Sequence, residues 1–246
     1  MHRLRSMSQI KITESAVRGE NLIYIKETLY AVNKQLGCIV ELKTGKNRSE
    51  LIIDVPSSYR DLVVSEVEDK IADVIAINYK YSFFKRNVNL SGLKPVESEL
   101  LLTTLISADI DEDKKYAIKK LKSFQEYALD GIFNFRMKPL KEKWYEILSY
   151  IPPEFQPNQL KEFIIYLIKD KNGKKVYFDD GCVYDRRYNL LKRRNLLFGD
   201  SKEIPFVKEI LLSGAGEVEL ATKLPESDER YVKELFGERA RFLNGY

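Results

Sequence analysis

The densest group of positive side chains in the sequence lies between residues 184 and 194. Five arginines and lysines stand there, separated by tyrosines and leucines. Guanidinium and ammonium groups neutralise phosphates, and an exposed tyrosine ring can stack on a base. The spacing therefore predicts a contact surface for nucleic acid or for a phosphorylated protein. The candidate contact residues are Arg186, Arg187, Tyr188, Lys192, Arg193 and Arg194.

The same segment also fits a solvated helix face, which is the commoner explanation of a short basic run. Leu190 and Leu191 would then point inward while the charged side chains faced water. The whole chain has 41 Lys and Arg against 37 Asp and Glu, a formal net charge of +4. So small an excess does not require a polyanionic partner, and the distribution of charge has to decide between the two interpretations.

The residues on which most enzyme mechanisms depend are scarce. His2 is the single histidine and stands near the N-terminus, so the sequence offers no Ser-His-Asp triad and no Cys-His dyad. Catalysis by paired carboxylates would need several Asp or Glu side chains to converge in one cleft with displaced pKa values. The motif content predicts a protein that is not an enzyme.

Two segments match ligand-binding motifs only in part. Gly214-Ala215-Gly216 lacks the rest of a phosphate loop and is followed by Glu217 and Glu219, so a turn is expected there. The acidic run Asp109–Asp113 lacks the spacing and the central glycine of a calcium loop. Acidic residues at a helix N-terminus oppose the helix dipole, which is the expected role. We predict neither a metal nor a cofactor.

The cysteines and the hydropathy pattern predict a soluble, cytoplasmic protein. Cys38 and Cys182 stand far apart and form no disulfide framework or CxxC pair, so two buried, reduced thiols are expected. The first residues lack the apolar centre of a secretory signal. No charge-free apolar run reaches the roughly 18 residues of a membrane helix.

The hydrophobic periodicity predicts a helix-rich α+β protein. Residues 1–88 form a small β-α-β-β-α unit, in which a hairpin turns at 45–49. Turn-forming residues at Asn89–Pro95 mark a boundary, and residues 95–246 form a mainly helical domain with a C-terminal β-hairpin near 174–184. The expected helices are Glu20–Leu36, 59–79, Val96–Ser107, Lys114–Phe124, Leu140–Ile151, Asn158–Lys169, Ile204–Leu212 and Ser227–Phe236, with a turn or short helix at Gly131–Phe135.

Two stretches, Ile71–Lys80 and Leu129–Lys138, resemble the YtxC-like family of sporulation proteins from spore-forming Firmicutes. The second contains Phe133-Asn134-Phe135-Arg136-Met137-Lys138, which is similar to the family's Phe- and Arg-containing run before a helix. The resemblance covers about residues 64–169. It implies a cytoplasmic, sporulation-associated protein and assigns no functional residues.

Aromatic side chains at 79–84 and 133–145 are expected to pack in the core, with a binding groove as the alternative. Arg136 is expected to bind a carboxylate or helix carbonyls, with partner binding as the alternative. The sequence thus predicts a non-enzymatic cytoplasmic interaction protein with an unidentified protein partner. The alternative is a nucleic-acid-binding protein that uses residues 186–194.

Overall fold

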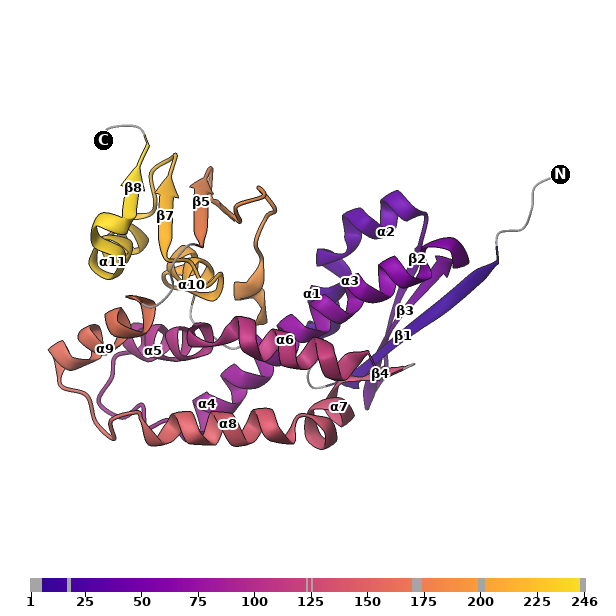
Figure 1. Ribbon diagram of the computed structural model, residues 1–246, viewed down its shortest axis with the longest axis horizontal. Coiled ribbons are helices and arrows are strands. Elements are labelled where there is room, and N and C mark those ends of the chain that lie inside the picture. The colour runs from indigo at the N-terminus through magenta and orange to yellow at the C-terminus, as the bar shows by residue number, and fades with distance from the viewer. Residues whose placement is uncertain are drawn as a thin grey trace. The chain divides into compact units, whose positions relative to one another are not determined.

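The computed structural model describes residues 6–16, 19–122, 124, 126–169, 174–198 and 202–243 (Figure 1). It confirms the helix-rich α+β class. The chain forms two compact units, and each unit is built from two separate stretches. Unit 1 comprises Met1–Tyr79 and Glu112–Trp144, and unit 2 comprises Lys80–Asp111 and Tyr145–Tyr246. His2 lies outside the described residues.

Unit 1 contains a four-stranded sheet with strand order β2-β3-β1-β4. β1 and β2 each pair antiparallel with β3, and β4 is parallel to β1. The register pairs Ile10 with Ile53 and Ile12 with Leu51, so one face of the sheet is apolar and buried. The strands are β1 (Met7–Ser15), β2 (Ile39–Thr44), β3 (Arg48–Pro56) and β4 (Tyr127–Ala128).

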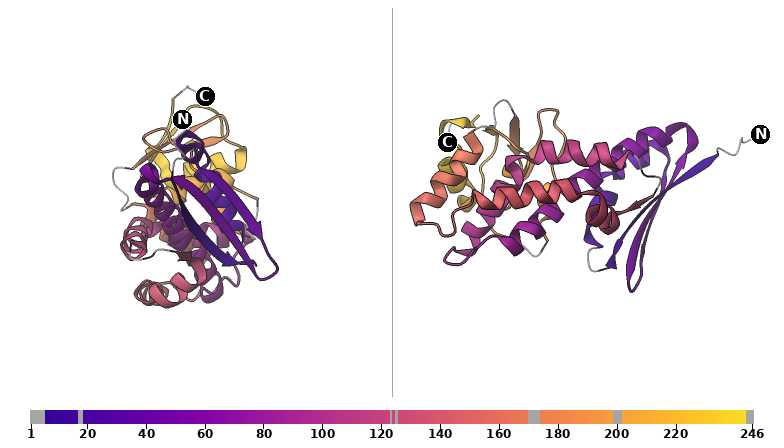
Figure 2. Two further views of the ribbon diagram at one scale, coloured as in Figure 1. Left: turned by 90° about the vertical axis from the view of Figure 1, so that its right-hand side faces the viewer. Right: turned by 60° about the horizontal axis from the view of Figure 1, so that its bottom comes forward.

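Helices of unit 1 cover that apolar face, as the views in Figure 2 show. Val63, Val67 and Ile71 recur at the spacing of a helix face and are fully buried. α6 and α8 each contribute residues to both units. The elements are α1 (Glu20–Thr28), α2 (Tyr30–Leu36), η2 (Ser57–Tyr59), α3 (Arg60–Asp73), the π-helical turn η3 (Val74–Tyr79), α6 (Ile110–Leu121), α7 (Leu129–Arg136) and α8 (Lys138–Ser149).

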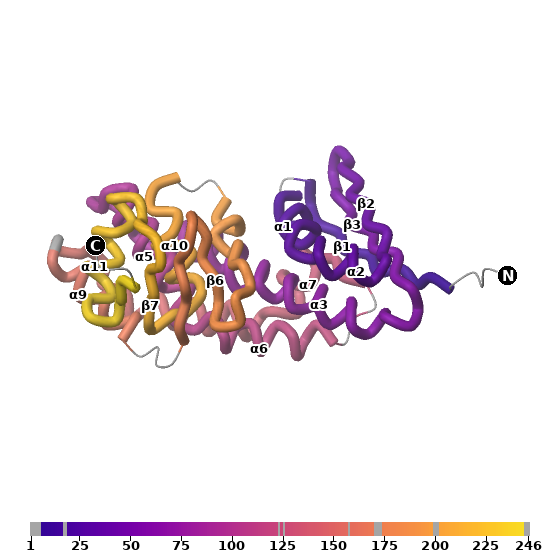
Figure 3. Tube along the Cα trace, turned by 90° about the horizontal axis from the view of Figure 1, so that it is seen from above, coloured from indigo at the N-terminus to yellow at the C-terminus, as the bar shows by residue number. Residues whose placement is uncertain are grey.

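Unit 2 contains a second four-stranded sheet with strand order β6-β5-β7-β8. β5, β7 and β8 are parallel, and β6, labelled in Figure 3, pairs antiparallel with β5 at one edge. The elements are α4 (Lys80–Asn87), α5 (Pro95–Ala108), α9 (Pro157–Lys169), β5 (Lys175–Asp179), β6 (Cys182–Tyr184), η4 (Arg193–Leu196), α10 (Pro205–Leu212), β7 (Glu217–Leu220), α11 (Glu226–Phe236), η5 (Gly237–Arg239) and β8 (Ala240–Phe242).

The β-α-β-β-α order and the C-terminal hairpin agree with the sequence prediction. The hairpin turns at Asp180 and Gly181, whose φ angles of 42° and 73° suit an Asp-Gly turn. The predicted helix Glu20–Leu36 is instead two helices, because Leu29 (ψ −1°) ends α1 before α2 begins. The strands β4, β7 and β8 were not predicted.

The compact units differ from the predicted division into 1–88 and 95–246. The segment 112–144 belongs to unit 1, since Tyr127 and Ala128 of β4 pair with β1. Residues 89–95 form a turn inside unit 2, where Gly92 has a φ of 84°.

The prediction of two buried thiols is wrong. Cys38 and Cys182 are free and each is partly exposed. Partial burial raises the pKa of Cys38 above that of an ordinary thiol. Cys38 follows the left-handed Gly37 that ends α2, a position that leaves its side chain at the start of the exposed edge strand β2.

Candidate contact loop

Residues 185–189 form a tight loop after β6, which we call the contact loop. Asp185 organises it: one carboxylate oxygen, Oδ1, accepts the backbone N–H groups of Arg187 (2.8 Å) and Asn189 (2.9 Å). The backbone N–H of Asp185 donates to the carbonyl of Asn189 at 3.0 Å, and that of Tyr188 donates to the carbonyl of Asp185 at 2.9 Å. These bonds fix the backbone of the tip.

Asp185 is ionised in this arrangement. Its partial burial acts to raise its pKa, but hydrogen bonds from Asn189 and Arg187 outweigh that effect and hold the pKa below the ordinary value. The carboxylate therefore stays charged down to acidic pH and keeps accepting the loop's N–H groups.

Tyr188 is presented outward at the tip of the contact loop. Its φ of 60° lies in the left-handed region that a bulky residue rarely adopts. The side chain is 69% exposed. Its ring stacks on Tyr177 of β5, with 4.9 Å between centroids and 16° between planes. One ring face is thus supported by the sheet, and the exposure leaves the other face open.

Arg186 and Arg187 directly precede Tyr188 and are exposed. Neither guanidinium donates a hydrogen bond or forms an ion pair with any residue that the structure describes. The aromatic ring and two positive charges of the predicted cluster are therefore available to a partner.

The other half of the predicted cluster turns inward. The backbone N–H groups of Arg193 and Arg194 donate to the two carboxylate oxygens of Glu209 at 2.8 and 2.9 Å. The Arg193 guanidinium donates to the carbonyl of Leu212 at 3.0 Å, and that of Arg194 lies 5.0 Å from the ring centre of Phe206. Both arginines therefore hold η4 against α10.

Lys192 lies between the two halves. It lines a small pocket of about 180 Å³ together with Arg194 and Glu209. The helix expected over this segment is absent: Leu190 forms an isolated bridge with Tyr184 and is exposed, and a short 3₁₀ turn begins only at Arg193. A turn held by Asp185 replaces the helix, because the carboxylate competes for backbone N–H groups.

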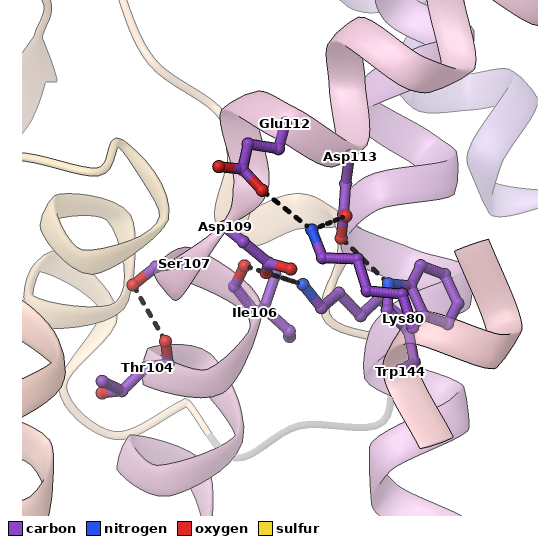
Figure 4. A network of polar contacts seen from close by, with 9 residues as sticks. Lys80, Thr104, Ile106, Ser107, Asp109, Glu112, Asp113 and Trp144 are labelled. Carbon is purple, nitrogen blue, oxygen red and sulfur yellow. Dashed lines mark hydrogen bonds and ion pairs between the residues drawn. The ribbon is translucent and has the colours of Figure 1, made fainter. Parts of the chain in front are cut away.

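The acidic side chains at 109–113 form ion pairs with lysines, as Figure 4 shows for most of them. Within unit 2, Asp109 pairs with Lys80, whose ammonium also donates to the carbonyl of Ile106 at 3.4 Å, and Asp111 pairs with Lys174. Within unit 1, Lys143 binds Glu112 (3.1 Å) and Asp113 (3.0 Å).

The indole of Trp144 donates to Asp113 at 2.9 Å. These contacts give the run a structural role in α6 and its neighbours. Across the described parts of the chain, no three His, Cys, Asp or Glu side chains gather as metal ligands would. The glycine segment forms the expected turn, in which Gly214 has a φ of 70° and the N–H of Gly216 donates to the carbonyl of Lys174.

The aromatic segments agree with the core prediction only in part. Tyr79, Tyr81, Phe83, Phe84, Phe133 and Trp144 are buried. Phe135, at 82%, and Tyr145, at 58%, are exposed instead. Arg136 is also exposed, and its guanidinium lies 5.8 Å from the ring centre of Phe124. Among the residues that the structure describes, no carboxylate or helix carbonyl accepts the expected bond from Arg136, and the ring of Phe124 lies beside its guanidinium instead.

The two stretches that carry the family resemblance meet within unit 1. The rings of Tyr79 and Phe133 lie 4.3 Å apart, and the Tyr79 hydroxyl lies 3.1 Å from a carboxylate oxygen of Asp130. Asp130 also accepts the backbone N–H of Ser15 at 2.7 Å, which ties α7 to the end of β1. These contacts give both stretches a role in the packing of unit 1.

Tyr177 is the site residue that sequence reasoning missed, and it is joined by Tyr184, which stands at the start of the basic cluster. They face each other in the β5–β6 register on the same face of the sheet. A hydrogen bond with Cys182, with some burial, raises the pKa of Tyr184 above its ordinary value, so its phenol is neutral at physiological pH. The alternation of Val176, Tyr177 and Phe178 was the available signal.

Comparison of the chain with protein-family models, with curated proteins and with solved structures finds no match. None of the described helices has the length and apolar character that a membrane crossing requires.

Proposed function

We propose that this chain is a non-enzymatic interaction protein that binds an anionic partner at the contact loop. The observation that carries the proposal is the pair Arg186 and Arg187, exposed and without ion pairs among the described residues, directly before an outward-facing Tyr188. Arginine and tyrosine are enriched where proteins bind partners.

The rigidity of the loop supports this proposal. The Asp185 carboxylate and the Tyr177 ring fix the tip before any partner arrives. A bulky residue with positive φ is strained, and such strain at an exposed position favours a functional role over a structural one. Preorganised side chains lose less conformational freedom on binding, so the loop is suited to recognition.

The roles of the buried carboxylates support a non-enzymatic function. Glu209 accepts the N–H groups of Arg193 and Arg194, and Asp228 accepts those of Phe206 and Val207. Both carboxylates are used to hold backbone, which leaves them unsuited to acid–base chemistry on a substrate. A cytoplasmic location and an association with sporulation remain predictions from the sequence.

The experiment is retention on immobilised heparin, a general polyanion. Wild type is compared with Arg186→Gln/Arg187→Gln and with a control, Lys223→Gln/Arg230→Gln, which removes the same charge from exposed positions of unit 2. We expect the loop variant to elute at clearly lower salt than both other proteins. Equal shifts in the two variants would mean that net charge alone acts, and no retention of wild type would contradict the proposal.

A further inference from the structure

The surface around the contact loop differs in charge and in aromatic content from the hollow at the start of α11. The hollow at the start of α11, about 730 Å³, is lined by Lys223, Arg230 and Lys233 but also by Glu226 and Glu229. Lys233 pairs with Glu229 there. Mixed charges that pair with one another give no preference for a ligand of either sign.

We infer that the outer face of β5 and β6, together with the contact loop, is a stacking platform for single-stranded nucleic acid. This inference deepens the proposed function by naming the partner, and it rests on that proposal. Three tyrosines, Tyr177, Tyr184 and Tyr188, converge on this face from two strands and the loop.

The open ring face of Tyr188 is the first element of the platform. Its other face lies on Tyr177 at 4.9 Å, so an incoming base would extend an existing stack. Every base has a π-face, and aromatic side chains that bind single strands use it without reading sequence. We therefore expect little sequence preference.

The distribution of charge on the platform would place the phosphates of a bound nucleic acid at one of its ends. Asp185, Arg186 and Arg187 follow β6 and carry a net positive charge, whereas the acidic turn Asp179–Asp180 precedes it. Lys175, also on the outer face, is held by Glu219 at 2.6 Å. Phosphates would follow the loop end, where the two arginines outnumber the single carboxylate of Asp185, whose Oδ1 already accepts two loop N–H groups.

The geometry favours a single strand over a duplex and over an acidic peptide. In a duplex the bases are stacked on one another, so none is available to Tyr188. An acidic peptide would use the two arginines, but it has no need of a tyrosine ring held outward by a strained backbone. The ring is the feature that distinguishes these partners.

The experiment is fluorescence anisotropy of the 246-residue chain with labelled oligo(U) and oligo(dT), a duplex of equal length, and a polyglutamate peptide. Tyr188→Asn removes the ring and suits the left-handed backbone, and Tyr188→Phe keeps the ring. Thermal unfolding of each variant checks that unit 2 is intact. We expect Tyr188→Asn to weaken oligo(U) binding roughly tenfold, Tyr188→Phe to bind as wild type does, and the duplex to bind more weakly.

The salt dependence provides a second measurement. Each phosphate contact on a single strand contributes about 0.7 to the slope of log affinity against log salt, so Arg186→Gln/Arg187→Gln should lower the slope by about 1.4. Tyr188→Asn should leave the slope unchanged, because stacking releases no counterions.

The outcomes separate this inference from the proposed function. Binding that depends on the arginines but not on the Tyr188 ring would overturn the platform and leave the proposed function standing. Binding of polyglutamate but of neither oligonucleotide would also overturn the platform and leave the proposed function standing. A wild-type protein that binds no polyanion at all would overturn both.

Discussion

At the residue scale, the buried carboxylate of Glu209 binds one half of the basic cluster and leaves the other half exposed. It accepts the N–H groups of Arg193 and Arg194 and is almost fully buried. Burial raises the pKa of Glu209, although the N–H groups of Arg194 and Arg193 act in the opposite direction. The folded state therefore binds a proton more readily than the unfolded chain, where a glutamate has a pKa of about 4.3.

This linkage predicts a pH dependence of stability. A raised pKa in the folded state contributes stability below about pH 4.3 that is lost as the pH rises through the folded-state value. Glu209→Gln cannot titrate at this position. The free energy of unfolding of wild type minus that of the variant should therefore fall as pH rises, by up to about 1.4 kcal/mol per pH unit. Urea unfolding at pH 5 and pH 7 measures it. A difference that grows with pH would contradict the assignment.

The sequence could not separate the two halves of the cluster. Arg186-Arg187 and Arg193-Arg194 are the same dipeptide, and each begins two residues after a tyrosine or leucine. Their roles differ because Glu209, from another element, reaches only the second pair. The contact is tertiary, and no spacing rule within 184–194 encodes it. Arg186, Arg187 and Tyr188 thus remain a candidate site, whereas Arg193 and Arg194 have structural contacts.

At the element scale, α10 depends on a residue of α11 for its cap. Asp228 is buried, and its carboxylate accepts the N–H groups of Phe206 (2.8 Å) and Val207 (2.9 Å), which open α10 after Pro205. The ring of Phe206 packs edge-on against Phe178 of β5. The cap therefore also holds the helix that supports the sheet beneath the contact loop.

Removing this cap predicts a loss of stability. Asp228→Ala leaves two N–H groups at the start of α10 without their acceptor and should lower the free energy of unfolding by about 2 kcal/mol. Asp228→Asn keeps an acceptor oxygen and should cost less. Urea unfolding followed by circular dichroism compares the two. Equal losses would mean that the carboxylate does not act as a cap.

Long periodic elements were predictable, and short strands were not. α9 presents Leu160, Ile164 and Ile168 on one buried face, which is the pattern that predicted it. β4 has two residues and β8 three, too few to show alternation. Their pairing with β1 and β7 depends on partners far away in the sequence. The π-helical turn at 74–79 likewise has no local signature distinct from a helix.

At the scale of the whole molecule, each unit is completed by a segment from the other half of the sequence. Unit 1 needs residues 112–144: Lys114 binds Asp73 at 2.7 Å, Tyr127 donates to Glu68 at 2.9 Å, and Asp130 contacts Tyr79. Local turn chemistry at 89–95 could mark a loop, but it could not show which helices pack with which sheet.

This organisation predicts that residues 1–88 do not fold stably alone. Without 112–144, the buried polar groups of Glu68 and Asp73 lose the partners Tyr127 and Lys114, and β1 loses its β4 neighbour. Buried charges without partners cost several kcal/mol, which is comparable to the stability of a small domain. We expect fragment 1–88 to show no cooperative urea transition by circular dichroism, and added peptide 112–144 to restore one. A cooperative transition of 1–88 that the peptide leaves unchanged would instead favour the division at 89–95.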